Sequence, residues 1–217
     1  MSGKADKTLA QILHDAITAH LYDVHVCLPA KVEKYDAAKQ KASIKPLLKK
    51  KYKSESQETE LPVITEVPVQ WPSAAGGDAF LHLPLKSGDF GVAIFCERSL
   101  DTWLQGSGQI VGPKDPRHHN LSDAIFVPGV RPFGAALSGA GAENVILQNG
   151  QMRIEMAPDG KISIEGGSEE FLTIVESVLD HLIGAKVITS IGASPFIGTT
   201  IANFQDDKAR LGAIKRS

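Results

Sequence analysis

Residues 144–166 read NVILQNGQMRIEMAPDGKISIEG, and this stretch decides the fold of the chain. Apolar residues recur at every second position and polar residues fill the positions between them, as in β-strands with one apolar face. Turns at Asn149-Gly150 and at residues 158–160 divide the stretch into three short strands. The apolar positions are Val145, Leu147, Met152, Ile154, Met156, Ile162 and Ile164.

A strand meander of this size needs a partner surface. Ordering roughly twenty residues costs more free energy than the burial of one small apolar face returns. No other segment of the chain alternates as strongly. We therefore expect the partner strands to come from identical copies of residues 144–167, arranged around a symmetry axis.

The composition is typical of a globular protein with one core and an appendage, or with two small domains. The chain has 217 residues, of which 42% are hydrophobic and 22% are charged, and its formal net charge is −2. This balance disfavours a strong preference for nucleic acids or membranes. Because the sequence opens on an amphipathic segment and lacks a long apolar run, we expect synthesis in a cytoplasm without a signal peptide or transmembrane helix. Cys27 and Cys96 are expected to be buried free thiols.

The rest of the chain divides into segments by its hydrophobic period. Helical spacing in residues 1–21 predicts an N-terminal amphipathic helix. Short strands follow in residues 22–105, and about five of them suit a small barrel of the oligonucleotide/oligosaccharide-binding (OB) type. Residues 106–143 are rich in Gly and Pro and predict an irregular connector that contains one strand at residues 124–128. The predicted fold class is therefore mainly β.

Residues 168–217 predict a C-terminal helical segment. Ser168 suits the N-cap of a helix that ends at Gly184, and a last helix is expected from Thr199 to Lys215. Apolar residues of the first helix follow a four-three-four spacing, which is a heptad seam. This seam would continue the interface of the strands, and its members are Phe171, Val175, Val178 and Leu182.

The region between Lys31 and Lys53 contains nine lysines. A groove for single-stranded nucleic acid would use such lysines, but few aromatic residues are available for base stacking and arginine is missing. The other interpretation is a set of solvated hairpin edges with a mobile loop at about residues 48–60.

Catalytic and metal-binding patterns in the sequence are weak. The seven histidines form no tight ligand set, because only His118 and His119 are adjacent and adjacent side chains usually point apart. His119, Ser122 and Asp123 could be combined into a Ser-His-Asp arrangement, but no strand-turn-helix elbow presents them. Paired carboxylates for glycan hydrolysis cannot be placed either. We expect no enzyme activity, no cofactor and no metal site.

Two motifs carry a resemblance to a known family: FCERSLDTWLQG at residues 95–106 and DPRHHNLSDAIFVPGVRP at residues 115–132. In this order they resemble the N-terminal domain of baseplate central-spike proteins from contractile-tailed bacteriophages, over about residues 21–132. The resemblance implies an OB-fold collar joined to a short, intertwined trimeric β-helix or prism. It also implies a virion protein of the tail baseplate, assembled in the host cytoplasm, mounted under a trimeric tail hub and driven through the host envelope.

The resemblance further implies structural roles for seven motif residues. They are expected to pack against the barrel (Trp103, Leu104), to fix a turn (Arg98, Asp101) and to direct the chain toward the threefold axis (Asp123, Pro128, Gly129).

The chain departs from spikes that pierce by themselves, which often end in an iron-binding His-x-His tip. This sequence has no His-x-His, its β region is short, and helices follow it. We therefore expect a homotrimeric shaft that binds the tail hub and contacts the host outer envelope transiently. A separate tip protein would complete it, or the helices would fold back around the prism. The alternatives are an OB-fold module for single-stranded nucleic acid and a tail component that binds or hydrolyses glycans.

Overall fold

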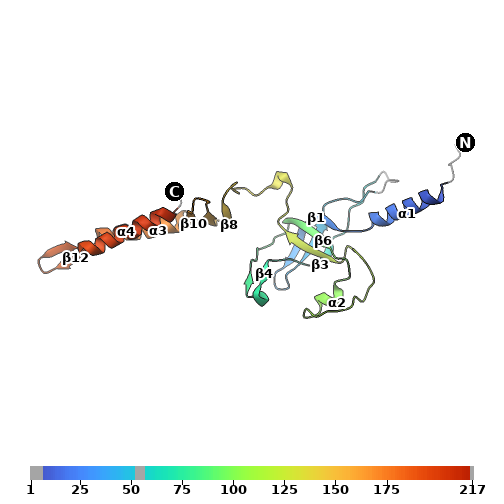
Figure 1. The fold of residues 1–217 in the computed structure, drawn as a ribbon, viewed down its shortest axis with the longest axis horizontal. Helices are drawn as coiled ribbons and strands as arrows, with labels where there is room; N and C mark the ends of the chain where they lie inside the picture. Colours follow the sequence, from blue (N-terminus) through green and yellow to red (C-terminus); the bar gives the residue numbers. More distant parts are fainter. Residues whose placement is uncertain (1–6, 52–56, 216–217) are drawn as a thin grey trace. The chain divides into compact units, whose positions relative to one another are not determined.

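The computed structural model describes residues 7–51 and 57–215, and the chain divides into two compact units. Unit 1 is Met1–Ala136 and unit 2 is Leu137–Ser217 (Figure 1). Residues 52–56 lie outside the described residues, and with them the end of the lysine-rich region and the middle of the predicted mobile loop. Residues 1–6 of the predicted N-terminal helix and residues 216–217 of the predicted C-terminal helical segment also lie outside the described residues.

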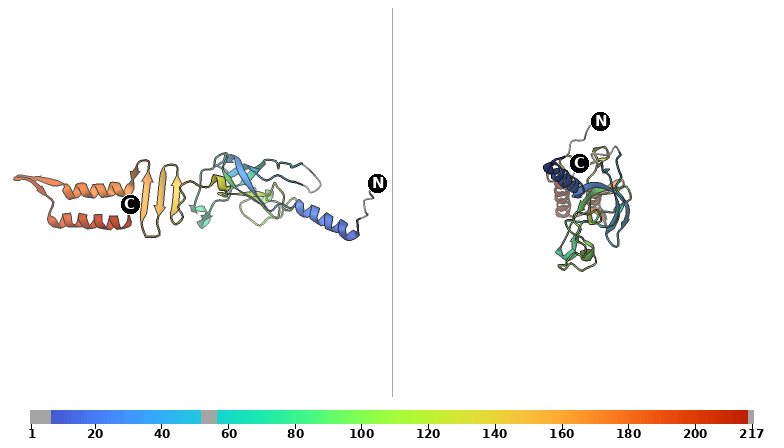
Figure 2. Two further views of the ribbon diagram at one scale, coloured as in Figure 1. Left: turned by 90° about the horizontal axis from the view of Figure 1, so that it is seen from above. Right: turned by 90° about the vertical axis from the view of Figure 1, so that its right-hand side faces the viewer.

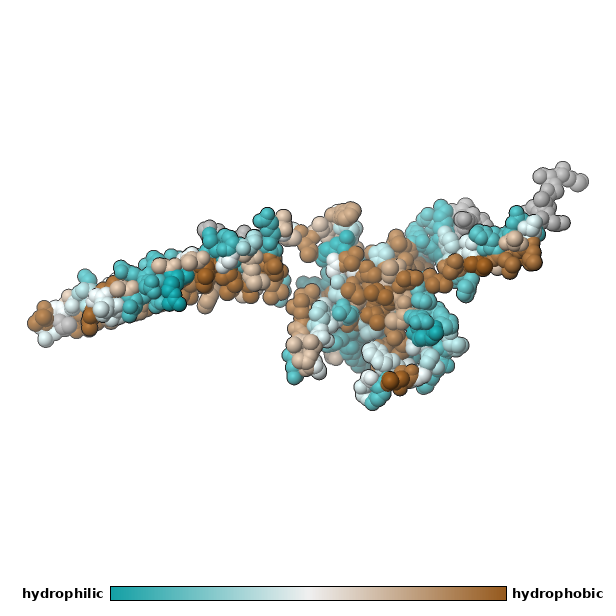
Figure 3. Space-filling view, in the orientation of Figure 1, coloured by the Kyte–Doolittle hydropathy of each residue, from teal (hydrophilic) through white to brown (hydrophobic). Residues whose placement is uncertain are grey.

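Unit 1 begins with the predicted N-terminal helix, α1 (Leu9–Tyr22). Thr8 caps this helix, because its hydroxyl accepts a hydrogen bond from the amide of Gln11 while the Gln11 side chain accepts one from the amide of Thr8. One side of α1 is apolar over its whole length (Figure 3). More than half of each of five large apolar side chains is exposed, namely Leu9, Ile12, Leu13, Ile17 and Leu21.

A curled, five-stranded antiparallel sheet forms the body of unit 1. Its strands lie side by side in the order β3-β2-β1-β6-β7, and a parallel bridge between Val69 and Phe126 joins the two edges. The sheet is therefore a half-closed barrel of the OB type, and the mainly β prediction is confirmed. The strands are β1 (Cys27–Asp36), β2 (Lys41–Pro46), β3 (Ile64–Pro68), β6 (Phe90–Phe95) and β7 (Ala124–Pro128).

The concave side of this sheet holds the core of unit 1. Alternate residues of each strand point inward, as a curled sheet with one wet face requires. The largest fully buried apolar side chains are Val32, Ile44, Val67 and Phe126. The sequence pattern assigns residues 124–128 to the connector, but the structure places them in the barrel, since every residue of β7 pairs with β6.

Short elements complete unit 1. Strands β4 (Ser73–Ala74) and β5 (Ala79–Phe80) pair around a 3-10 turn, η1 (Ala75–Gly77). A single helical turn, α2 (Asp101–Leu104), lies between β6 and β7, and η2 (Phe133–Ala135) follows β7.

Unit 2 contains the alternating stretch as an antiparallel sheet with the strand order β11-β10-β9-β8. Helix α3 follows this sheet and packs against α4, and a two-stranded hairpin, β12–β13, joins the two helices. The long strands of the sheet run crosswise to α3 and α4 (Figure 2). The elements are β8 (Val145–Asn149), β9 (Met152–Met156), β10 (Ile162–Gly166), β11 (Glu169–Glu170), α3 (Phe171–Gly184), β12 (Lys186–Thr189), β13 (Gly192–Pro195) and α4 (Gly198–Ile214).

The two C-terminal helices confirm the prediction, with two corrections. The N-cap of α3 is Glu170 instead of Ser168, because the Glu170 carboxylate reaches the amides of the first helical turn. The segment between the helices, for which the sequence predicts no strand, contains the hairpin, since residues 186–189 pair with residues 192–195.

Gly91 in β6 lies against β7, where a side chain would have no room. A methyl group added there would lie 2.5 Å from the ring of Phe126 and 2.4 Å from the carbonyl oxygen of Val127. We expect Gly91→Ala to lower the free energy of unfolding by about 1–3 kcal/mol, because a packed core cannot yield that space. Urea unfolding followed by tryptophan fluorescence measures the change. Gly112→Ala is the matched control, since an added methyl group there meets nothing within 4 Å; equal effects of both variants would contradict the prediction.

Candidate functional site

The seven alternating apolar residues of unit 2 share one face of its sheet. Val145 lies opposite Met156 and Met156 lies opposite Ile162, while Leu147, Ile154 and Ile164 form the next row. Residues directly opposite each other in antiparallel strands point to the same side. Met152 is two residues from Ile154 on the same strand and completes the set. We call these seven side chains the apolar face.

The apolar face is open in the single chain. The exposed fractions are 62% for Val145, 50% for Leu147, 55% for Met152 and 46% for Met156. Ile154, Ile162 and Ile164 are half-buried. Large contiguous apolar surfaces of this kind mark interaction sites in proteins.

A polar network occupies the opposite face of the sheet. The buried Glu155 carboxylate accepts hydrogen bonds from Asn144 Nδ2 at 2.6 Å and from Arg153 Nε at 2.9 Å. The Arg153 guanidinium also donates to Gln148 Oε1 at 2.9 Å and to the carbonyl oxygen of Gly139 at 3.1 Å. These bonds hold the segment before β8 against this face. The apolar face is therefore the side of the sheet that remains available to a partner.

Glu170 fixes the start of α3 relative to the sheet. Its carboxylate accepts hydrogen bonds from the amides of Leu172 and Thr173 in the helix and from the amide of Ile164 in β10, at 3.0, 2.6 and 3.2 Å. Burial alone would raise the pKa of Glu170, but these hydrogen bonds outweigh it and hold the pKa below its ordinary value. The charged cap thus joins helix and sheet into one body.

Helix α3 has two apolar sides. The first side contains Leu172, which is buried, and Val175 and Leu182, which are half-buried. The helix as a whole packs against α4. Ion pairs between the helices, including Lys208 with Asp180 at 2.7 Å, support this packing. A second side remains open, and we call it the α3 stripe: Phe171, Ile174 and Val178, exposed by 54%, 46% and 50%.

The predicted helix seam is therefore divided between these two sides. Phe171 and Val178 lie in the open α3 stripe, whereas Val175 and Leu182 are half-buried. The heptad spacing does not include Ile174, because it steps four residues from Phe171 to Val175. A spacing of three residues from Phe171 would have found it.

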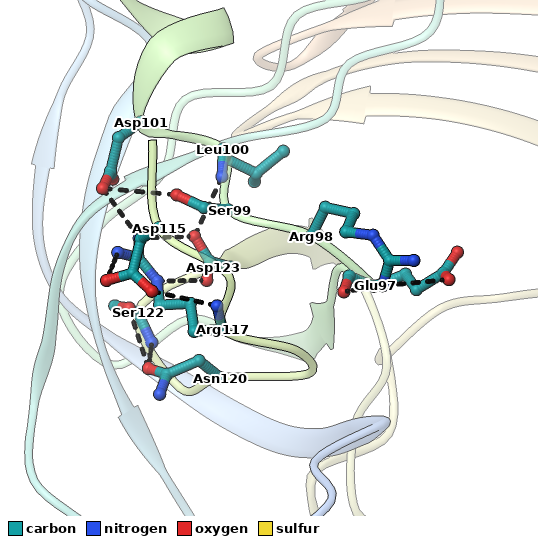
Figure 4. A network of polar contacts seen from close by, with 10 residues as sticks. All are labelled: Glu97, Arg98, Ser99, Leu100, Asp101, Asp115, Arg117, Asn120, Ser122 and Asp123. Atoms are coloured by element: carbon teal, nitrogen blue, oxygen red, sulfur yellow. Dashed lines mark hydrogen bonds and ion pairs between the residues drawn. The ribbon is translucent and has the colours of Figure 1, made fainter. Parts of the chain in front are cut away.

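A buried ion pair organises the segment between β6 and β7 in unit 1. Asp123 is fully buried, and its two carboxylate oxygens accept hydrogen bonds from Arg117 Nε and Nη2 at 2.7 and 2.8 Å (Figure 4). The amide of Leu100 also donates to this carboxylate at 2.9 Å. Arg117 additionally pairs with Asp101 at 2.8 Å and with Asp115 at 3.3 Å. One guanidinium thereby joins Asp101 and Asp115 to Asp123, which directly precedes β7.

The comparison with known families concerns this unit. Residues 28–129 match the family model described as the phage protein Gp138 N-terminal domain. This match supports a phage structural protein and an association with the virion. It covers somewhat less than half of the chain, begins in β1 and ends directly after β7. A search of curated proteins gives no match.

The matched residues 28–129 include all seven motif residues to which the resemblance gives roles. Asp101 and Asp123 share Arg117, and Arg98 contacts its neighbour Glu97 and the His118 ring. Trp103 and Leu104 in α2 are 49% and 42% exposed. Pro128 ends β7.

Gly129 lies directly after β7, at the end of the matched range. Its φ of +115° lies in the region that favours glycine, and its amide donates to the carbonyl oxygen of Phe90 at 3.0 Å. Arg117 was not singled out in the sequence, although the Asp115-Pro116-Arg117 motif contains it. Its partners Asp101 and Asp123 are distant in sequence, so spacing could not reveal the network.

The weaker chemical hypotheses find little support in the described residues. Asp123 is engaged by Arg117, and the Ser122 hydroxyl donates to Asn120 Oδ1 at 2.8 Å, so these residues form a turn in place of a Ser-His-Asp arrangement. Within residues 7–51 and 57–215, no three His, Cys, Asp or Glu side chains are placed to hold a metal ion together. None of the described helices combines the length and apolarity needed to cross a bilayer. Cys27 is exposed, contrary to the prediction, and Cys96 is half-buried.

The lysine-rich region is largely neutralised by its own surroundings. Six of the eight lysines described in this region form an ion pair with a nearby carboxylate, including Lys45 with Glu60 at 3.2 Å and Lys50 with Asp23 at 2.5 Å. Nucleic-acid grooves instead present cations to the phosphate backbone. The six are Lys31, Lys41, Lys45, Lys49, Lys50 and Lys51.

Proposed function

We propose that the chain is the homotrimeric central spike of a phage baseplate, which attaches to the tail hub and helps to penetrate the host cell envelope. The observation that carries the proposal is the exposed apolar face, which lies opposite the Glu155 network. Three copies arranged around one axis would turn their apolar faces inward and bury them together. The match of unit 1 to a phage protein domain supports a role in the virion.

The α3 stripe supports the same proposal, because it could be buried around the same threefold axis as the apolar face. Phe171 directly follows β11, and the Glu170 carboxylate holds the first turn of α3 to β10. The α3 stripe and the apolar face therefore belong to one body. In three copies, the stripes would meet as the seam of a short coiled coil below the prism.

The proposed role is mechanical, and it needs rigidity and attachment. Each sheet would lie against two others, so that a sideways load is shared by three chains. The exposed apolar side of α1 would bind the tail hub, because amphipathic helices commonly dock in apolar grooves of partner proteins. The host outer envelope would be a transient partner, and a separate tip protein would be a further one.

Val178→Glu tests the trimer through α3. The variant would place three carboxylates in one apolar seam, and buried unpaired charges are strongly destabilising. We expect the concentration at which the trimer dissociates to rise at least about tenfold, which corresponds to about 2.7 kcal/mol per trimer because the dissociation constant of three chains varies as the square of that concentration. Sedimentation velocity over a dilution series measures it. Ser177→Glu is the matched control, because Ser177 is the exposed neighbour of Val178 outside the stripe; the same dissociation in both variants would argue against the seam.

A further inference from the structure

The β12–β13 hairpin carries exposed apolar side chains that the trimer proposal does not use. It lies between α3 and α4, at the end of the helix pair opposite the sheet (Figure 2). Ile188 and Ile191 are 89% and 97% exposed, and Ile197, at the base of the hairpin, is 76% exposed. Apolar atoms gather at this end of unit 2 in Figure 3.

The surrounding sequence is free of charge. Between Lys186 and Asp206 the chain has nineteen consecutive residues without an acidic or basic side chain, which is its longest such stretch. An exposed hairpin in water normally carries charged side chains, especially lysine, which prevent its edges from pairing with other chains. Lys186 provides such a charge only at the base of the hairpin.

The apolar side chains leave the hairpin in several directions. Val187 pairs with Ser194 and Ile188 pairs with Ala193, so these neighbours project from opposite faces of the two-stranded ribbon. Ile191 lies in the turn itself. A single protein surface, including a second copy of this chain, could cover only one of these faces. A medium that surrounds the hairpin on all sides, such as lipid, would cover them all.

We propose that the turn of the β12–β13 hairpin inserts into the apolar boundary of a lipid bilayer. This inference rests on the proposed spike function, because it identifies the lipid of the host envelope as the partner of this end. The insertion is shallow, since the outer edges of a two-stranded ribbon leave backbone groups that hydrocarbon cannot satisfy. Lys186 would remain at the headgroup level. Three hairpins in one trimer would bind together and strengthen the attachment.

Vesicle flotation with the full chain tests the inference. The vesicles contain phosphatidylethanolamine and phosphatidylglycerol, and a second set contains phosphatidylcholine alone. We expect the protein to float with both sets, because apolar insertion does not require charged lipids. The double variant Ile188→Asp, Ile191→Asp should reduce the bound fraction at least about tenfold. Ile110→Asp is the matched control, because Ile110 is a fully exposed isoleucine of unit 1, and it should bind like the original chain.

Three results would overturn the inference: no binding of the original chain to either vesicle set, binding only to the anionic set, or equal binding of the double variant. Light scattering on the same samples separates this inference from the proposed function. A trimer that does not float contradicts the hairpin inference alone, whereas a monomer contradicts the spike proposal. If the double variant dissociates the trimer, the hairpin is a contact between copies and the lipid inference is wrong.

Discussion

Ile154→Asp is expected to convert the trimer to monomers. Ile154 lies at the centre of the apolar face, between Leu147 of β8 and Ile164 of β10. In the proposed trimer, three aspartates would be buried close to one another, and no cation of the apolar face could neutralise them. The mass measured by light scattering should fall from about 70 kDa for three chains to the 23.2 kDa of one chain.

The control for Ile154→Asp is Gln151→Asp. Gln151 is exposed in the turn between β8 and β9, so its replacement introduces the same charge away from the apolar face. Gln151→Asp should retain the trimer mass. Near-ultraviolet circular dichroism should show that unit 1 remains folded in both variants, since the barrel has its own core. A trimer of Ile154→Asp at micromolar concentration would refute the placement of the threefold interface.

Asp123→Ala is expected to produce the largest loss of stability in unit 1. The substitution leaves Arg117 beside β7 without its buried partner and also removes the acceptor of the Leu100 amide. Breaking a buried ion pair by removing one partner costs about 3–5 kcal/mol. Chemical unfolding measures the difference. Asp115→Ala is the control, because Asp115 is half exposed and its ion pair with Arg117 is longer, at 3.3 Å; its effect should remain below about 1 kcal/mol.

The same carboxylate predicts a pH dependence. Burial alone would raise the pKa of Asp123, but the hydrogen bonds from Arg117 and Leu100 outweigh it, so the pKa in the folded chain lies below its ordinary value of 3.8. A lowered folded-state pKa contributes stability that is complete above that ordinary value and is lost as the pH falls through the folded value. Unit 1 should therefore lose stability in acid below about pH 4, and Asp123→Ala should show a smaller loss over that interval. Equal acid sensitivity of both proteins would contradict this assignment.

The sheet of unit 2 could be predicted in detail from its residues. Strict alternation and two turns with Asn-Gly and Asp-Gly predict three strands with one apolar face. The pairing of β8, β9 and β10 places the apolar residues opposite one another on that face. The helix seam was predicted less well, because α3 is apolar on two sides and a heptad count selects positions from both. Ile174 therefore remained outside the prediction.

The parts that could not be predicted depend on contacts distant in sequence. Arg117 joins residues from Asp101 to Asp123, and no spacing rule encodes such a network. Glu170 caps α3 while also reaching β10, so its role depends on the position of the sheet. Strand β7 follows a long irregular segment, and only its pairing with β6 assigns it to the barrel. Cys27 is exposed because it begins β1 outside the core.

The native mass of the purified full chain decides whether the proposed symmetry is correct. Light scattering coupled to size-exclusion chromatography measures the mass independently of molecular shape. We predict about 70 kDa, three times the chain mass of 23.2 kDa, unchanged over a tenfold dilution. A stable monomer, or a dimer that buries two apolar faces against each other, would contradict the proposed trimeric spike.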